Sequence, residues 1–417
     1  MKVLIYSANY APEPTGIGKY SGEMAEWLVA KGHEVRVVAA PPYYPHWKVD
    51  AGYAWPPYQR ESLNGVDVWR APLWVPHQPG GLKRVLHLLS FALTSTPLML
   101  RQIFWSPDVV LTVAPALACA PVGWLTARLC GAQAWLHIQD FEVDVAFQMN
   151  LLKGRRTQQF ALWCEKKLLQ AFDKVSTIST KMVDRLLAKG VDSRSVELFP
   201  NWVDVHSVTP LATPSAYRGE LGLAPETTVV LFSGTWGAKQ DLLLIPQVAQ
   251  LLGERADVAF VICGDGLMRP QVEAACSALG NVRLLPLQPK ERLGELLGMA
   301  DIHLLTQSAD AEDLVLPSKL TGMLSSGRPI IATCRADTEI GQVVGRCGVV
   351  VAPGCPEQLA QAVLSLADDR ATQQELGSRA RAYAEHSLAK DPILLRWTLT
   401  ASQHVVPSGA EQLRHRG

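Results

Sequence analysis

The amino-acid sequence predicts an α/β protein built from two Rossmann-like domains that face each other across a cleft. Its 417 residues correspond to two or three domains at roughly 150 residues per domain. Short runs rich in β-branched residues alternate with longer helical patterns, which indicates βαβ units and parallel sheets. The alternation starts again after a linker at residues 205–219, which contains Pro210 and Pro214. Sheets of this kind bind ligands at the carboxyl ends of their strands.

The first half contains five predicted strands. A helical pattern at residues 20–31 is followed by Gly32 and a β-rich run, which is typical of a helix that stops at a glycine before the next strand. The strands are expected at residues 3–6, 34–40, 108–113, 134–138 and 174–178.

Residues 41–79 interrupt this alternation. Seven prolines precede Pro79 and eight residues are Tyr or Trp. Proline prevents a regular central strand over much of the segment. Long insertions often carry binding function, and the alternative is a folded flap that packs its own aromatic side chains.

Residues 82–105 are the most apolar long stretch, but their uncharged centre at 88–100 is shorter than the ~20 residues of a spanning helix. The N-terminal apolar run is also too short for a signal peptide, so we expect a cytoplasmic protein. Lys83 and Arg84 begin a helical pattern, and Pro97 is expected to kink or end it. Its apolar face lies either in a membrane interface or in a buried core. That face comprises Leu82, Val85, Leu86, Leu89, Ala92 and Leu93.

The composition argues against several functional classes. Lys plus Arg and Asp plus Glu are both 39, so no net positive field favours nucleic acid. Hydrophobic residues make up 48% and charged residues 19%, as in soluble globular chains. The eight cysteines form no C-x-x-C pair, which argues against a zinc cage or a disulfide framework and predicts reduced, mostly buried thiols.

The second half repeats the alternation. Its strands are expected at residues 227–233, 258–263, 282–285, 302–306 and 329–332.

Turns between strands and helices supply candidate anion-binding groups. Glycines allow an anion to approach the backbone at a helix N-terminus, and a lysine suits a diphosphate. In the first half, Gly16 and Gly18 form such a turn, and a tight turn without a ligand is the alternative. Three turns of the second half share these features. They contain Gly234, Lys239 and Gln240; Gly264, Asp265 and Gly266; and Ser318 and Lys319.

The motifs of this chain, taken in their order along the sequence, resemble those of family-4 glycosyltransferases of the GT-B fold over nearly the whole chain. The general motifs are Pro14-Thr-Gly-Ile-Gly-Lys-Tyr20, Lys31-Gly-His-Glu-Val35, Pro200-Asn201-Trp202, Gly264-Asp-Gly266, Leu316-Pro-Ser-Lys-Leu320 and Ser326-Gly-Arg-Pro-Ile330. A narrower resemblance is to the colanic acid fucosyltransferases of bacterial exopolysaccharide assembly. It is carried by Ala40-Pro-Pro-Tyr-Tyr-Pro45, Leu136-His-Ile-Gln-Asp-Phe-Glu-Val-Asp144 and Val175-Ser-Thr-Ile-Ser179.

The resemblance implies a retaining transfer of a deoxyhexose, fucose from GDP-fucose, to a polyprenyl-diphosphate-linked sugar. It implies an acceptor-binding domain at residues 1–205, a nucleotide-sugar-binding domain at 206–384, and a C-terminal helical segment at 385–417 that packs back toward the first domain. A protein of this kind works in the cytoplasm, peripherally on the inner membrane.

A departing diphosphate needs cationic and N–H donors, and this requirement assigns roles to residues of this sequence. Lys239 and Lys319 are expected to stabilise the leaving diphosphate without metal or cofactor, and Asp140 is a third candidate catalytic residue. Lys83 and Arg84 are expected to meet the lipid-linked acceptor and the membrane surface. The candidates for binding the nucleotide sugar are Gly16, Gly18, Gly234, Gln240, Gly264, Asp265, Gly266, Asp313 and Ser318.

The chain also departs from the family pattern. Many family members carry two glutamates with seven residues between them, where this sequence has Leu314 and Gly322. The family often has an Arg shortly before the phosphate-binding lysine, here Lys239, where this sequence has Thr235. It also has a His before the aspartate, here Asp140, where this sequence has Gln139. His137, Glu142 and Asp144 are further polar candidates beside Asp140.

Two other functions fit the same fold. A sugar-nucleotide epimerase needs acid and base groups but no apolar acceptor surface, whereas a non-catalytic nucleotide-sugar-binding scaffold fits the absent glutamate pair. A transferase that uses a UDP-sugar donor is a further alternative.

Overall fold

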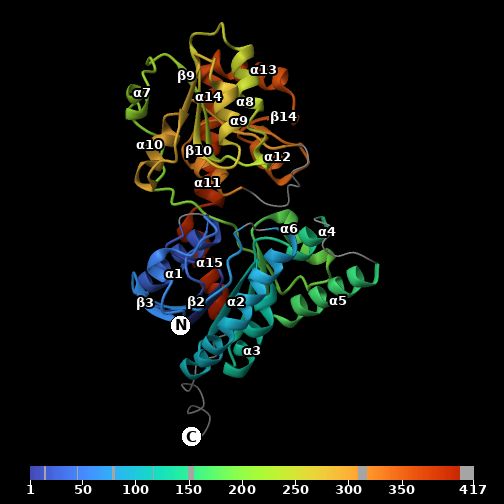
Figure 1. The fold of residues 1–417 in the computed structure, drawn as a ribbon. Helices are drawn as coiled ribbons and strands as arrows, with labels where there is room; N and C mark the ends of the chain where they lie inside the picture. Colours follow the sequence, from blue (N-terminus) through green and yellow to red (C-terminus); the bar gives the residue numbers. More distant parts are fainter. Residues whose placement is uncertain are drawn as a thin grey trace. The chain divides into compact units, whose positions relative to one another are not determined.

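The computed structural model describes residues 1–13, 16–44, 46–77, 80–115, 117–148, 155–308 and 317–403. The chain forms two compact units, each with a predominantly parallel sheet, which confirms the predicted α/β class (Figure 1). The first unit comprises Met1–Pro200 and the segment that begins at Asp391, and the second comprises Asn201–Lys390.

The first unit contains an eight-stranded sheet in the order β3-β4-β2-β1-β5-β6-β7-β8. Neighbouring strands are parallel except β3 and β4. All residues of β5 and β6 are buried, as expected for parallel strands covered on both faces. All five strands predicted for this half are present. The strands are β1 (Lys2–Ser7), β2 (Glu34–Ala39), β3 (Gln59–Leu63), β4 (Val66–Arg70), β5 (Val109–Ala114), β6 (Gln133–Ile138), β7 (Lys174–Thr177) and β8 (Val196–Leu198).

Helices connect these strands. The first helix leads to Gly32, whose φ of +84° lets the chain turn into β2 while the His33 N–H donates to the Leu28 carbonyl at 3.0 Å. The helices of this unit are α1 (Gly16–Ala30), α2 (Gly81–Arg101), α3 (Ala120–Cys130), α4 (Glu142–Gln148), α5 (Arg155–Ala171), α6 (Thr180–Ala188) and α15 (Lys390–Ser402).

Although α15 lies near the end of the sequence, it packs on elements of the first unit (Figure 1). The Trp27 indole N–H donates to a carboxylate oxygen of Asp391 at 2.6 Å. The Trp397 ring lies 5.2 Å from the Trp135 ring of β6. The C-terminal helix is therefore part of the core of this unit.

The aromatic insertion is partly incorporated into the sheet. Strands β3 and β4 occupy the proline-free stretch between Pro57 and Pro72, and β4 pairs with β2. The Arg70 side chain is fully buried at the end of β4 and donates to Glu61 at 2.8 Å and to the Ala40 carbonyl at 2.9 Å. This guanidinium fastens the insertion to the sheet.

The structure of helix α2 excludes one of the two alternatives expected for Pro97 and one of the two expected for its apolar face. It continues through Pro97 to Arg101, so Pro97 does not end it. The alternative of a buried core stripe is wrong, because five of the six apolar residues on that face are exposed and only Ala92 is buried. Its buried residues are His87, Phe91, Ala92, Ser95 and Met99. Among the described residues, no helix is both long enough and apolar enough to cross a membrane.

The second unit contains a six-stranded sheet in the order β11-β10-β9-β12-β13-β14, with every neighbouring pair parallel. Alternate residues of β9 enter different cores, Val229 on one face and Val230 on the other. All five predicted strands are present, and β14 is an additional edge strand. The strands are β9 (Thr228–Thr235), β10 (Val258–Asp265), β11 (Val282–Leu285), β12 (Ile302–Leu305), β13 (Ile330–Thr333) and β14 (Gly348–Val351).

Helices cover both faces of this sheet, which makes it doubly wound (Figure 1). They are α7 (Ala216–Glu220), α8 (Leu244–Leu251), α9 (Arg269–Cys276), α10 (Leu293–Gly298), α11 (Ser318–Ser325), α12 (Glu339–Val344), α13 (Pro356–Ala367) and α14 (Arg370–Ser387).

Candidate functional site

Two of the predicted glycine turns meet at the carboxyl ends of β9 and β10. Gly234 and Gly264 are directly opposite each other in the parallel register. Their φ angles are +143° and +147°, a conformation that side chains rarely allow. A Cβ on Gly264 would overlap the Gly234 carbonyl. The two backbones therefore approach each other closely, and no side chain at either glycine covers them.

Trp236 packs against the second of these turns. Its side chain is 1% exposed. Its backbone N–H donates to the Asp265 carbonyl at 2.8 Å, and its backbone carbonyl accepts from the Met268 N–H at 3.0 Å. A Cβ on Gly266 would overlap the Trp236 backbone. Sequence reasoning missed this role, although a tryptophan directly after a glycine turn was visible in the motif.

Lys319 is the most unusual residue of the site. It lies in the first turn of α11, and its Cδ would be 3.3 Å from a Cβ on Gly234. Its side chain is half-buried, but Nζ is shielded from solvent and has no hydrogen-bond partner among the described residues. Burial lowers the pKa of Lys319 to about 7. A cation without a partner beside two open glycine turns provides a position for an oxyanion.

The other residues predicted in the second unit are more exposed. Lys239 lies in the short turn Ala238–Gln240, with its side chain exposed and its carbonyl accepting from Ser308 at 2.9 Å. Gln240 fixes the end of that turn, because its carbonyl accepts from the Thr306 hydroxyl at 2.5 Å. Among the described contacts, none joins the Lys239 ammonium to Lys319.

Asp265 and Ser318 flank the glycine turns. The exposed Asp265 carboxylate accepts from the Gly266 N–H at 2.8 Å and pairs with Arg269 at 3.2 Å. Ser318 is exposed and begins α11. Asp313 lies outside the described residues, as does Leu314. The structure thus brings the glycine turns and Lys319 together, with Lys239 on a neighbouring turn.

Gly322, which stands where many family members have the second glutamate, faces the interior. A Cβ there would lie 3.0 Å from Cδ1 of Leu297 in α10. No side chain at this position contributes to ligand binding in this chain.

The first glycine turn lies against a buried carboxylate that the sequence did not reveal. Glu13 is 4% exposed and accepts from the backbone N–H groups of Tyr43 and Tyr44 at 3.1 and 3.0 Å. A Cβ on Gly18 would lie 2.8 Å from a Glu13 carboxylate oxygen, so Gly18 leaves room for this side chain. Burial raises the pKa of Glu13. This carboxylate links the turn that begins at Gly16 to the aromatic insertion.

Three of the polar candidates in and after β6 serve the fold. His137 is buried, its Nδ1 lies 2.9 Å from the Ser176 hydroxyl, and burial lowers its pKa to about 3, so its ring stays neutral. Glu142 accepts from the Leu117 N–H. Asp144 is buried and pairs with Lys189 at 2.9 Å. Asp140 differs from these three because its side chain is exposed.

Lys83 and Arg84 are both exposed in the first turn of α2. They adjoin the exposed apolar stripe of this helix. Its members are Leu82, Val85, Leu86, Leu89 and Leu93, which are 68%, 40%, 47%, 41% and 74% exposed. Cations beside an exposed apolar stripe are typical of helices that bind membrane interfaces.

Comparisons with known proteins agree with this architecture. Residues 15–202 match the family of the Glycosyl transferase 4-like domain, and residues 227–369 match Glycosyl transferases group 1. A protein of Escherichia coli (strain K12), named as the colanic acid biosynthesis glycosyl transferase WcaI, is 41% identical over 401 residues. The match covers 94% of this chain and 98% of that protein.

Solved structures share the fold. Sucrose-phosphate synthase from Thermosynechococcus elongatus matches with a TM-score of 0.73 and 17% identity, over 96% of this chain and 98% of that one. HepE of Anabaena, solved in complex with UDP-glucose, matches with a TM-score of 0.67 and 17% identity, over 97% of this chain and 100% of that one. At these identities the similarity establishes the fold alone.

Proposed function

This chain belongs to the family-4 glycosyltransferases of the GT-B fold, and from that premise we propose that it transfers a deoxyhexose to a lipid-linked sugar. The proposed donor is GDP-fucose, and the proposed acceptor is a polyprenyl-diphosphate-linked sugar of exopolysaccharide assembly. Similarity to WcaI over nearly the full chain supports the pathway class.

The observation that carries this proposal is the Lys319 ammonium beside Gly234, whose Nζ has no hydrogen-bond partner among the described residues. During transfer, the bond between the sugar C1 and the diphosphate oxygen breaks and negative charge grows on the departing diphosphate. Groups already placed to meet that charge lower the barrier, because they interact more strongly with the transition state than with the substrate. Lys319 and the open glycine turns are placed to do so, and the exposed Lys239 adds a second cation.

The proposed reaction retains the configuration at C1. A new bond forms between C1 and the acceptor hydroxyl oxygen, and the hydroxyl proton passes to the departing diphosphate, which leaves as GDP. The protein positions the two substrates and stabilises charge. Asp140 is the exposed carboxylate that we assign to the reacting sugar or acceptor. Because lysines and backbone N–H groups meet the diphosphate, we propose that no divalent metal is needed.

We assign the acceptor to the first unit, where α2 carries the exposed apolar stripe with Lys83 and Arg84. An amphipathic acceptor keeps its chain in the bilayer while its diphosphate meets these cations. Such contact places the protein peripherally on the inner membrane.

A donor screen tests the proposal. Isothermal titration with GDP and UDP sugars is followed by turnover with a lipid-linked acceptor and analysis of the product. We expect GDP-fucose to bind and its fucose to reach the acceptor as an α or β linkage identical to that in the donor. Turnover with a UDP-sugar instead would reassign the donor. Isomerised donor without transfer would identify an epimerase, and binding without turnover a scaffold.

A further inference from the structure

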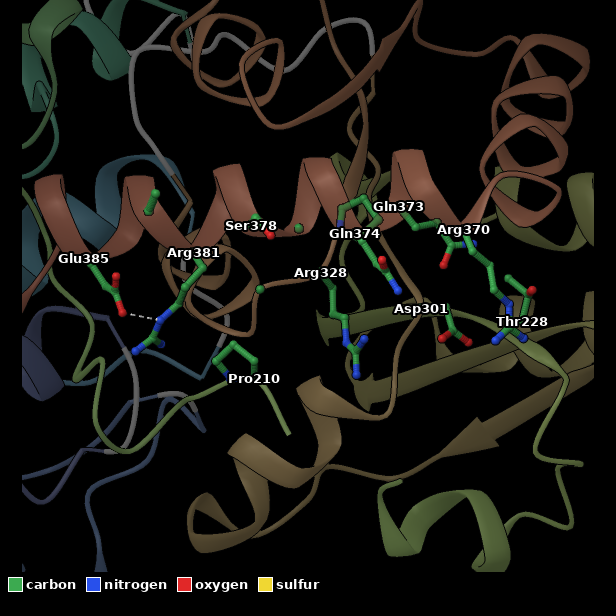
Figure 2. Close-up of a pocket in the computed structure, with 14 residues that line it drawn as sticks. Pro210, Thr228, Asp301, Arg328, Arg370, Gln373, Gln374, Ser378, Arg381 and Glu385 are labelled. Atoms are coloured by element: carbon green, nitrogen blue, oxygen red, sulfur yellow. Dashed lines mark hydrogen bonds and ion pairs between the residues drawn. The ribbon is translucent and has the colours of Figure 1, made fainter. Parts of the chain in front are cut away.

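A pocket of the second unit lies beside α14 and is lined by residues that lie outside the glycine turns in the sequence (Figure 2). The pocket has a volume of about 450 Å³ and is roofed by α14. Thr228 begins β9 and Pro329 immediately precedes β13, so the pocket borders the amino ends of these strands. From Thr228 to Gly234 the strand extends about 20 Å at 3.3 Å per residue. The pocket is therefore separate from the candidate site described above.

Two arginines of this pocket form no ion pair with another described residue. The Arg328 guanidinium is half-buried, and one N–H donates to the Gly298 carbonyl at 3.2 Å. Its Nε is buried and has no partner among the described residues, and burial lowers the pKa of Arg328. Arg370, in the first turn of α14, is exposed and has no ion-pair partner in the described part of the chain. A buried N–H without an acceptor is costly, so an incoming oxyanion would relieve it.

The two carboxylates that line the pocket are already neutralised. Asp301 accepts from Arg218 at 2.5 Å and from the Val229 N–H at 2.8 Å. Glu385 pairs with Arg381 at 2.7 Å. The other N–H groups of Arg381 donate to atoms of the protein itself. They donate to the carbonyl oxygens of Val205, Val208 and Ser325 and to the Ser325 hydroxyl. Arg328 and Arg370 are therefore the lining cations that pair with no described carboxylate, although Asp301 still attracts Arg328 electrostatically.

The rest of the lining is neutral and rich in hydrogen-bonding groups. Figure 2 shows Gln374 directed from α14 into the space between Arg328 and Asp301, with Ser378 one turn further along. Both side chains are exposed. The lining residues include no aromatic ring, and a nucleobase would have nothing to stack on. Amides and hydroxyls instead match the hydroxyl groups of a sugar.

We propose that this pocket is a second binding site for a small polyhydroxylated anion, a sugar that carries one phosphate or carboxylate group. Guanidinium groups bind both kinds of oxyanion through paired N–H donors. A volume of about 450 Å³ lies in the range of small-molecule sites. The site requires neither the donor nor the acceptor of the proposed transfer, so it stands independently of that function.

Isothermal titration of the full chain with three matched sugars tests the proposal. Glucose 6-phosphate and glucuronate carry different anions at C6, and glucose carries none. We expect one or both anionic sugars to bind and glucose not to bind. The anion that binds more tightly identifies the source as a phosphorylated sugar or an acidic saccharide.

Two variants of α14 localise the binding. Arg370→Gln should weaken it by about tenfold, because one charge-assisted interaction is lost. Arg379→Gln changes an exposed arginine of the same helix that does not line the pocket, and binding should be unchanged. Thermal unfolding of both variants checks that they fold. The proposal is overturned if neither anionic sugar binds, if Arg370→Gln binds like wild type, or if inorganic phosphate binds as tightly as glucose 6-phosphate.

Discussion

The Lys319 ammonium lies 4.3 Å from the centroid of the Phe232 ring, with no hydrogen-bond partner for Nζ among the described residues. Burial lowers the pKa of Lys319 from its usual 10.5 to about 7. An anion that binds beside Nζ favours the charged form and raises this pKa again. Ligand binding and proton uptake at this residue are therefore linked.

Above pH 7, we expect GDP binding to take up a proton at Lys319. A growing fraction of the free protein carries the neutral amine, so the affinity for GDP should fall by up to about tenfold per pH unit. Titration calorimetry in buffers of different ionisation enthalpy measures the uptake directly. Lys319→Ala should weaken binding by ~1.5–3 kcal/mol and abolish the uptake.

Lys239→Ala is the matched comparison. Its side chain is exposed, so the variant should also weaken binding by ~1.5–3 kcal/mol while the proton uptake persists. Wild-type affinity in both variants would refute the assignment of the diphosphate to these lysines.

Lys319→Met should stabilise the ligand-free protein while it weakens GDP binding. Methionine has a similar length and needs no hydrogen bond, so the cost of the shielded ammonium, about 1–3 kcal/mol, is removed. Between pH 7 and 10.5 the unfolded chain holds more protons at Lys319 than the folded chain, so wild-type stability rises with pH there. The advantage of the variant should accordingly be larger at pH 6 than at pH 9. Denaturant unfolding at both pH values measures it, and an advantage that does not shrink with pH would contradict the shielded-amine model.

Gly264→Ala should destabilise the second unit by more than about 2 kcal/mol. The added Cβ would overlap the Gly234 carbonyl, and the φ of +147° adds strain. Gly280→Ala is the control, because a Cβ there meets nothing within 4 Å, and its effect should stay within about 0.5 kcal/mol. Urea unfolding midpoints compare the two. Equal midpoints would show that the close approach of the glycine turns is not required.

The strands of both sheets could be predicted because buried parallel strands are continuous β-branched runs between helical patterns. Strand β14 was missed although Gly348–Val351 contains three consecutive valines; it is short and lies at the edge of the sheet. The β3–β4 hairpin was not predicted, because prolines are frequent in the surrounding segment. Pro57 and Pro72 lie outside the two strands. For α2, apolar spacing shows which residues share a face and not whether another element covers it.

The site was predictable to the extent that glycine turns have local signatures. Gly234, Gly264 and Lys319 were all identified from strand-to-helix motifs, and their ligand remains a prediction. Glu13 and Trp236 were not identified, because their roles depend on partners brought close by the fold. Tyr43 lies 30 residues from the Glu13 carboxylate that accepts its N–H, a separation that no local motif encodes.

Chelation should leave transfer largely intact. If lysines and backbone N–H groups meet the departing diphosphate, EDTA removes no required charge. The measurement is the initial rate of transfer with and without EDTA, using donor and acceptor at fixed concentrations. A loss of activity that Mg²⁺ or Mn²⁺ restores would overturn the metal-independent mechanism.

Charge reversal at the start of α2 should separate membrane contact from donor binding. Lys83 and Arg84 are exposed beside the apolar stripe of the same helix, and each basic residue near an anionic surface contributes about 1 kcal/mol. Changing both Lys83→Glu and Arg84→Glu should release the protein from anionic liposomes and raise the KM for a lipid-linked acceptor, with GDP affinity unchanged. The double variant Lys31→Glu, Arg194→Glu makes the same charge change on exposed residues outside α2 and should float like wild type. If wild type itself fails to float, or if the α2 variant uses the acceptor normally, the exposed stripe is not the membrane-binding surface.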